Sequence, residues 1–168
     1  MKGENKEESK SEREYYEFIK AKIEEILNTK FDNFHLEITA DKKFSNKLKA
    51  EIPDYRHIIF HFLKEVAPDI TGFIKKEYSS DFIVIEVKAE AVKLDHIYQT
   101  RKYAELFDAK YALLVSTEEI PEEIKRLSKI VYSLLSLPGY RHMTLVHFDD
   151  DSKEFVEWFP ENPFEKGG

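Results

Sequence analysis

Three charged residues stand at the ends of two apolar segments. Asp69 opens DITGFI (69–74), and Glu86 and Lys88 stand near the end of DFIVIEVKA (81–89). Side chains two residues apart on a strand project from the same face, so Glu86 and Lys88 point together. Two carboxylates at neighbouring strand ends are hard oxygen ligands that suit Mg²⁺, and an adjacent lysine steadies negative charge or positions a water. This arrangement predicts metal-assisted hydrolysis of phosphodiester bonds.

A plainer interpretation of the same residues stays open. Glu86 and Lys88 could form an ordinary ion pair on an edge strand, with Asp69 as a turn residue, because surface ion pairs are common. The apolar setting argues against this, since a strand reading IVIEV (83–87) is expected to be buried on both faces. Buried charge needs a partner or a metal ion.

The pattern formed by Pro68-Asp69 and Glu86-Val87-Lys88, on neighbouring strands, resembles the PD-(D/E)xK nuclease superfamily. The resemblance implies a restriction-endonuclease-like fold. It implies that Asp69 and Glu86 bind Mg²⁺, for which Mn²⁺ can substitute, and that Lys88 assists hydrolysis. It covers about residues 66–117, a third of the chain.

A second motif lies on the next expected helix. Gln99 and Tyr103 are four residues apart and so share one helix face. Q-x-x-x-Y downstream of E-x-K resembles the RecB-like nuclease subgroup, which implies that Gln99 and Tyr103 contact the DNA or support the metal ligands. The alternative is a half-buried glutamine beside a core tyrosine, because aromatic residues at helical spacing usually belong to a core.

The first helix could supply a further metal ligand. Members of the superfamily often add an acidic residue from this helix, and Glu24 and Glu25 are the candidates here. We expect Glu25 to be the ligand, because it adjoins Ile26 and Leu27 at the edge of the apolar stripe. The alternative for either residue is a solvated helix face.

Periodicity defines the elements that must position these residues. Apolar residues at helical spacing predict helices over 11–28, 54–66, 94–107 and 121–136. Alternating or continuous apolar runs predict strands over 34–40, 69–74, 81–89, 111–117, 144–148 and 154–159. The pairs 69–74 with 81–89 and 144–148 with 154–159 are expected to be hairpins. The apolar 111–117 segment after a helix indicates that part of the sheet is parallel.

The expected helix starts have recognisable capping residues. A capping box formed by Ser11 and Glu14 predicts the first start, Asp54 and Asp95 are expected N-caps, and Pro121 suits a first turn. The sequence therefore predicts a single α/β domain over 11–160, with a restriction-endonuclease-like central mixed β-sheet flanked by α-helices. Residues 1–10 are expected to be a disordered tail and 161–168 a frayed one.

Composition narrows the class of protein. The 168 residues carry a net charge of −7, which argues against coating nucleic acid with a broad basic surface, and no cysteine is present for a disulfide or thiolate metal site. No apolar run is long enough for a membrane span, so the default location is cytoplasmic. The expected partner is nucleic acid, with DNA preferred, and a homodimer would allow both strands to be cut.

Two further possibilities stay open. The same fold could be a catalytically silent module that binds nucleic acid or protein. The acidic net charge favours that alternative, whereas the intact Asp69, Glu86 and Lys88 favour a nuclease. The motifs could also be chance occurrences in a globular domain, but two of them follow in order on the expected elements.

Overall fold

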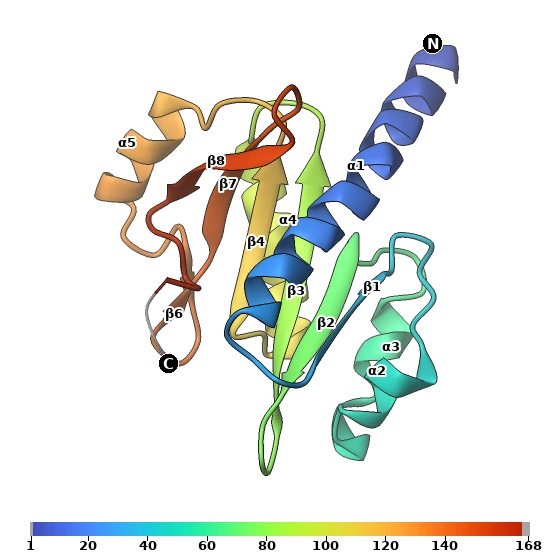
Figure 1. Cartoon of the computed structure of the whole chain (residues 1–168). Coiled ribbons are helices and arrows are strands. Elements are labelled where there is room, and N and C mark those ends of the chain that lie inside the picture. The colour runs from blue at the N-terminus through green and yellow to red at the C-terminus, as the bar shows by residue number, and fades with distance from the viewer. Residues whose placement is uncertain (1, 166–168) are drawn as a thin grey trace.

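A central six-stranded sheet organises the computed structural model, which describes residues 2–165 and their side chains from residue 12 onward. The strand order is β1-β2-β3-β4-β7-β8. Figure 1 shows helix α1 lying diagonally across one face of the sheet and α4 against the other. The predicted α/β class, with a mixed sheet flanked by helices, is confirmed.

The strands fall close to their predicted positions. They are β1 Phe34–Ile38, β2 Ile70–Lys75, β3 Ser80–Lys88, β4 Tyr111–Ser116, β7 Thr144–Asp149 and β8 Glu154–Phe159. Strands β1, β2 and β3 pair antiparallel, β4 and β7 continue parallel to β3, and β8 returns antiparallel. The parallel portion and both hairpins are therefore confirmed. A two-stranded sheet, β5 Ser136–Leu137 with β6 Arg141–His142, was not predicted.

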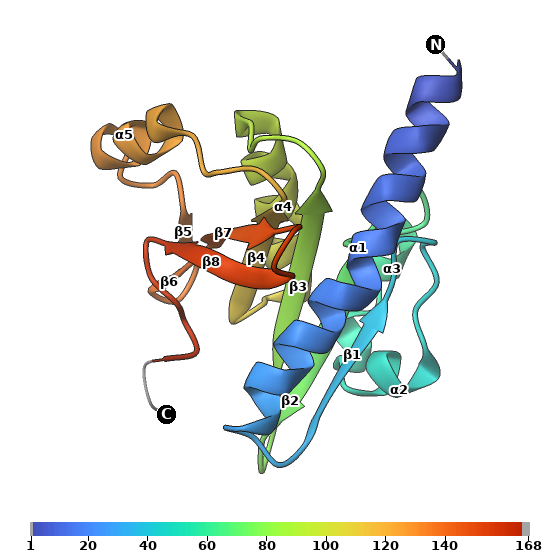
Figure 2. The ribbon, with the colours of Figure 1, turned by 45° about the horizontal axis from the view of Figure 1, so that its top comes forward.

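The helices surround this sheet. They are α1 Lys2–Asn28, α2 Asn46–Ala50, the 3₁₀ turn η1 Asp54–Arg56, α3 Ile59–Phe62, α4 Leu94–Phe107 and α5 Glu122–Ile130. Figure 2 shows α1 on the opposite side of β3 from α4, with α2 and α3 beside β1. Within the described part of the chain, none of these helices has the length and apolar character to cross a membrane.

Strand β3 separates two hydrophobic cores. Ile83, Ile85 and Val87 pack in the core beneath α1, whereas Phe82 and Val84 pack in the core beneath α4. The alternation puts Glu86 on the α4 face, in step with Val84. The prediction that β3 is buried on both faces is confirmed, and it leaves Glu86 only 3% exposed.

The predicted helix over 54–66 is wrong. The segment forms η1 and the single turn α3, and Pro53 rather than Asp54 holds the N-cap position. Ile59 and Leu63 are buried, but Ile58 and Phe62 are 64% and 59% exposed. The apolar stripe therefore offers only two packed positions, too few to hold a long helix against the sheet.

Helix boundaries differ elsewhere as well. Helix α1 begins at Lys2, within the segment expected to be a disordered tail, so the Ser11 capping box does not start it. Helix α4 has its predicted bounds, but its N-cap is Lys93 and Asp95 lies in the first turn. Helix α5 ends at Ile130, and the chain then turns into β5.

The predicted frayed tail is wrong for residues 161–165. Phe164 is 2% exposed, and its ring stacks on Tyr111 with centroids 4.7 Å apart. An aromatic anchor therefore holds this end against the start of β4. Residues 166–168 lie outside the described part of the chain.

Candidate active site

Two carboxylates face each other where β2 begins and β3 ends. The antiparallel register pairs Ile70 with Ile85, so Asp69 and Glu86 are the next pair outward. The Asp69 N–H donates to Glu86 Oε1 at 3.0 Å, and the Val87 N–H donates to Asp69 Oδ2 at 2.8 Å. Backbone groups therefore fix both carboxylates, which is the convergence that the sequence predicted.

Thr39, the residue after β1, holds the start of β2 in place. The Thr39 hydroxyl donates to the Pro68 carbonyl at 2.5 Å, and the Thr39 N–H donates to the Asp69 carbonyl at 2.8 Å. Thr39 is fully buried. Its contacts with Pro68 and Asp69 were not predicted, because they depend on β1 pairing with β2.

Helix α1 contributes Tyr16 and Glu12 to the site. The Tyr16 hydroxyl donates to Asp69 Oδ1 at 3.0 Å. Glu12 stands four residues earlier, on the same helix face, and its negative charge contributes to raising the pKa of Asp69 and of Glu86. Neither residue was predicted, although the sequence shows an acid and a tyrosine four residues apart beside the apolar stripe.

Glu25 does not join the carboxylates. It follows Tyr16 by about two and a half turns of α1, and so points from the opposite side of the helix. Its side chain is 71% exposed and pairs with Lys22 at 3.7 Å. The expectation that Glu25 is a metal ligand is therefore wrong. Glu25 does adjoin Ile26 at the edge of the apolar stripe, but near the end of α1 that is distant from Tyr16 and Asp69.

Burial controls the ionisation of the carboxylate pair. Loss of hydration raises the pKa of Asp69, against the hydrogen bonds from Val87 and Tyr16 and the charge of Lys88. Burial also raises the pKa of Glu86 well above its ordinary value, and the charge of Asp69 raises it further. Two negative charges held together in a buried site favour a bound cation.

Lys88 lies beside Glu86 as the strand periodicity predicted. Its Nζ is 3.9 Å from Glu86 Oε2, the outer limit of an ion pair, and its side chain is 19% exposed. The amino group therefore lies near the carboxylates without forming a close ion pair with Glu86. It remains available to an anionic group that approaches from solvent.

Helix α4 brings Gln99 and Tyr103 close to the same end of β3. Gln99 Nε2 donates to the Tyr103 hydroxyl at 3.3 Å. Burial raises the pKa of Tyr103 to about 12, and the charges of Glu86 and Asp69 add to the rise. Tyr103 is 1% exposed, so it supports the site from within the core, while the half-buried Gln99 lies nearer to solvent.

His96 lies one turn before Gln99 on α4. Burial lowers its pKa, and the positive charge of Lys88 lowers it further. Its Nδ1 accepts from the Lys93 N–H at 3.1 Å, and its Nε2 lies 3.3 Å from Glu90 Oε1. A neutral imidazole is therefore favoured beside Lys88.

The donor set fits a hard divalent cation. Asp69 and Glu86 supply carboxylate oxygens, the ligands that Mg²⁺ prefers, and usually only one or two such side chains hold it. Across residues 12–165, no cluster of three or more histidines, aspartates or glutamates has a geometry that could hold a metal ion. The candidate site thus rests on two carboxylates, with Glu12 as an added negative charge.

Comparisons with family models, with curated proteins and with solved structures find no match to this chain.

Proposed function

We propose that this chain is a metal-dependent nuclease of the PD-(D/E)xK type, with a restriction-endonuclease-like fold, that hydrolyses phosphodiester bonds of DNA. The observation that carries the proposal is the buried pair of Asp69 and Glu86, joined through backbone hydrogen bonds and accompanied by Lys88. A structural ion pair needs one acid and one base. A surplus of buried carboxylate is costly unless a cation accompanies it.

Each residue has a role in this proposal. Asp69 and Glu86 would hold Mg²⁺, or Mn²⁺ in its place, which polarises a phosphoryl oxygen and lowers the pKa of bound water. The Lys88 amino group would orient the attacking water or steady negative charge on the phosphoryl oxygens. Tyr16 would keep Asp69 ionised and oriented through its hydrogen bond.

The Gln99–Tyr103 pair would position the substrate, Gln99 by direct contact and Tyr103 through Gln99. Gln99 would contact the nucleic acid, and Tyr103 would fix the Gln99 amide and the wall beside Glu86. We further propose a cytoplasmic location, in keeping with the cysteine-free sequence. A homodimer that cuts both strands stays a prediction.

A cleavage assay tests the proposal. Labelled single-stranded DNA, double-stranded DNA and RNA are each incubated with Mg²⁺, with Mn²⁺ and with chelator. We expect metal-dependent cutting of DNA that is lost in Asp69→Asn and Lys88→Met. Glu25→Gln is the matched acid-to-amide control, since Glu25 points away from the site, and it should retain wild-type cutting.

Two other results would redirect the proposal. Metal binding that Asp69→Asn abolishes, without cutting of any nucleic acid, would favour the catalytically silent binding module. Absence of both cutting and metal binding would mean that the carboxylate pair is structural, and the nuclease proposal would then be wrong.

A further inference from the structure

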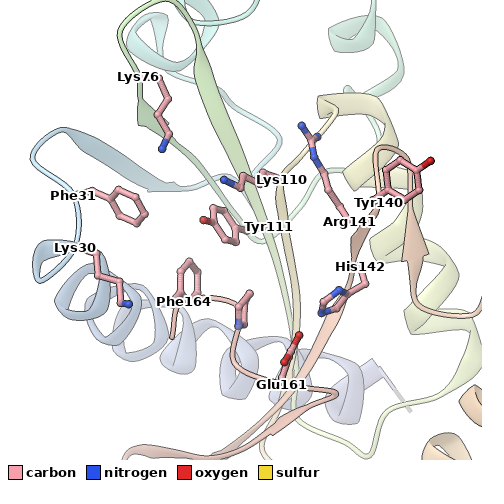
Figure 3. Close-up of a pocket in the computed structure, with 11 residues that line it drawn as sticks. Lys30, Phe31, Lys76, Lys110, Tyr111, Tyr140, Arg141, His142, Glu161 and Phe164 are labelled. Carbon is pink, nitrogen blue, oxygen red and sulfur yellow. The ribbon is translucent and has the colours of Figure 1, made fainter. Parts of the chain in front are cut away.

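A cavity of about 480 Å³ lies at the other end of the sheet from Asp69 and Glu86. Five parts of the chain line it: the loop after α1, the β2–β3 turn, the start of β4, strand β6 with the residue before it, and the C-terminal segment, as Figure 3 shows. Its volume falls within the range of small-molecule sites.

The cavity carries an excess of positive charge. Lys30, Lys76, Lys110 and Arg141 line it, and Glu161 is the one acidic residue among the described residues that line it, on a protein whose net charge is −7. Outside the lining, Asp81 pairs with Lys76 and Lys110, and Asp108 pairs with Arg141, so four cations still outnumber three carboxylates. In Figure 3 the amino groups of Lys76 and Lys110 extend toward the space in front of Tyr111. Such a local reversal of sign attracts an anion.

The two central lysines keep part of their charge available. Lys76 and Lys110 share the carboxylate of Asp81, each at 3.6 Å, and their side chains are 42% and 41% exposed. One carboxylate cannot neutralise two ammonium groups. An incoming anion could therefore bridge both lysines without first breaking a close ion pair.

Aromatic rings form the apolar part of the cavity. Phe31 stands on one side and the stacked pair of Tyr111 and Phe164 on the other. Lys76 Nζ lies 5.3 Å from the Phe31 centroid, and Lys110 Nζ lies 5.5 Å from the Tyr111 centroid. Flat rings beside cations suit a ligand that is itself aromatic and anionic.

Two polar groups add possible partners for a sugar or a base. His142 Nε2 is shielded from solvent and has no hydrogen-bond partner among the described residues. Its ring extends from β6 toward Phe164, and the Glu161 carboxylate lies below it in Figure 3. The imidazole nitrogen can exchange a hydrogen bond with the hydroxyl groups of a sugar or the polar edge of a base.

We propose that this cavity binds a nucleoside monophosphate, with the phosphate on Lys76 and Lys110 and the base against Phe31 and Tyr111. A phosphomonoester carries a charge of about −1.5 to −2 at neutral pH. It therefore suits Lys76 and Lys110, which share one carboxylate, better than a ligand with a singly charged carboxylate group would. The ligand is either a free mononucleotide or the phosphorylated end of a nucleic-acid strand. This inference does not rest on the nuclease proposal, because it uses none of the same residues.

The single tryptophan provides a direct measurement. Trp158 lies against Phe164, with ring centroids 6.2 Å apart, so a ligand that contacts Phe164 should change its fluorescence. The intact chain, in chelator to prevent hydrolysis, is titrated with adenosine 5′-monophosphate. We expect a saturable change for this nucleotide and much weaker binding of adenosine and of inorganic phosphate.

Matched variants connect that binding to the cavity. Lys76→Gln with Lys110→Gln should raise the dissociation constant roughly tenfold or more, because two charge-assisted contacts are lost. Lys43→Gln with Lys129→Gln makes the same change in net charge at exposed positions outside the cavity and should leave the constant unchanged. Phe31→Leu keeps an apolar side chain and should also weaken binding, through loss of the ring.

The outcomes separate clearly. Tighter binding of a short 5′-phosphorylated oligonucleotide than of the mononucleotide would identify a strand end as the source, and the reverse order would identify the free nucleotide. Failure of the wild type to saturate, or equal weakening by both lysine pairs, would overturn the proposal. Cleavage at the Asp69–Glu86 site, measured separately, should be the same in the Lys76→Gln/Lys110→Gln variant.

Discussion

The two ends of β3 use the same kinds of charged residue in opposite proportions. At its start, Asp81 lies 3.6 Å from both Lys76 and Lys110, and the two lysine side chains are 42% and 41% exposed whereas that of Asp81 is 19% exposed. At its end, Glu86 and its neighbour Asp69 share one lysine, 3.9 Å from Glu86. One end therefore has surplus cations and the other has surplus carboxylates, which is why we assign an anion to the first and a metal cation to the second.

Burial makes the difference matter energetically. The ion pairs of Asp81 are half open to solvent through Lys76 and Lys110, and pairs that water reaches in this way contribute about 0–1 kcal/mol. Glu86 is 3% exposed, so its charge is poorly hydrated and the charge of Asp69 acts on it strongly. The carboxylate end should therefore respond to mutation, pH and metal much more than the lysine end.

Glu86→Gln should have the largest effect, and it should separate activity from stability. We expect cleavage to fall roughly 100-fold or more, because a charged ligand of the cation is lost. We expect the metal-free protein to become more stable at pH 8, by roughly 1 kcal/mol or more, because a buried charge is removed. Cleavage rates and urea unfolding in chelator measure the two effects.

Glu25→Gln is the control for this prediction. It removes the same charge from an exposed position on α1, so the free energy of unfolding should change by less than about 0.5 kcal/mol. A Glu86→Gln protein that is less stable than wild type in chelator would contradict the claim that the carboxylate end is electrostatically strained.

Gly72→Ala should damage both ends together, because β2 connects them. A Cβ at Gly72 would lie 2.1 Å from the His35 carbonyl oxygen and 2.4 Å from Leu36 Cδ2, so β1 must shift. We expect a loss of roughly 1–3 kcal/mol in the free energy of unfolding, measured by urea titration. Metal binding and nucleotide binding should both weaken under conditions in which the variant stays folded.

Gly139→Ala is the comparison for that substitution. Gly139 adopts φ +78 but lies outside the six-stranded sheet, and an added Cβ has no contact closer than 3.7 Å. Backbone strain alone should cost about 1 kcal/mol. Equal losses from the two substitutions would mean that the close approach of β1 to β2 does not hold the sheet together.

The central part of the chain could be predicted from sequence because its signals are local and strong. Strand alternation in the apolar segment that ends in Glu86 and Lys88 shows that these two side chains share one face of the sheet. Apolar residues recur at helical spacing throughout 94–107, so this helix was predicted with its correct bounds. Asp69 and Glu86 then lie opposite each other because the two segments pair as an antiparallel hairpin. These steps require only strand alternation and a turn.

The rest depended on contacts between distant segments. Tyr16 reaches Asp69 only because α1 crosses that end of the sheet, and the spacing within α1 does not say which end of the helix lies over Asp69. Phe164 likewise becomes an anchor only when it meets Tyr111. The cavity proposed for the nucleotide combines five segments and has no sequence motif.

The stability of the metal-free protein should fall as the pH rises above about 5. Burial raises the pKa of Asp69 and of Glu86 in the folded state, so folding favours their protonated forms. Their contribution is fully present below the unfolded values near 4 and is lost as the pH rises through the higher folded values. Urea unfolding in chelator between pH 5 and pH 8 measures the fall, and Mg²⁺ should reduce it.

His96 acts in the opposite direction within the same range. Its pKa is lowered in the folded state, so its contribution to stability is lost as the pH falls. His96 is present in both wild type and Glu86→Gln, so its contribution cancels when their free energies of unfolding are subtracted at each pH. If that difference does not grow between pH 5 and pH 8, Glu86 is not the cause of the pH dependence.

Tyr16→Phe should have an effect confined to low pH, and it tests how α1 acts on the site. The Tyr16 hydroxyl donates to Asp69 Oδ1, and this hydrogen bond lowers the pKa of Asp69 against the effect of burial. Its removal should raise that pKa further, so the acidic limb of the pH–rate profile for cleavage should move to higher pH. One hydrogen bond to a charged group corresponds to about 1.5–3 kcal/mol, so cleavage should fall roughly tenfold or more near pH 6 and much less above pH 8.

Tyr15→Phe distinguishes this role from loss of a tyrosine on α1. The Tyr15 hydroxyl donates to Asp150 at 2.7 Å, in an exposed contact with the β7–β8 turn. The substitution therefore removes a similar hydrogen bond at a place away from Asp69. It should leave the acidic limb where it is. A uniform loss of cleavage at every pH in Tyr16→Phe would mean that the hydroxyl only holds α1 in place, whereas a loss confined to low pH means that it keeps Asp69 ionised.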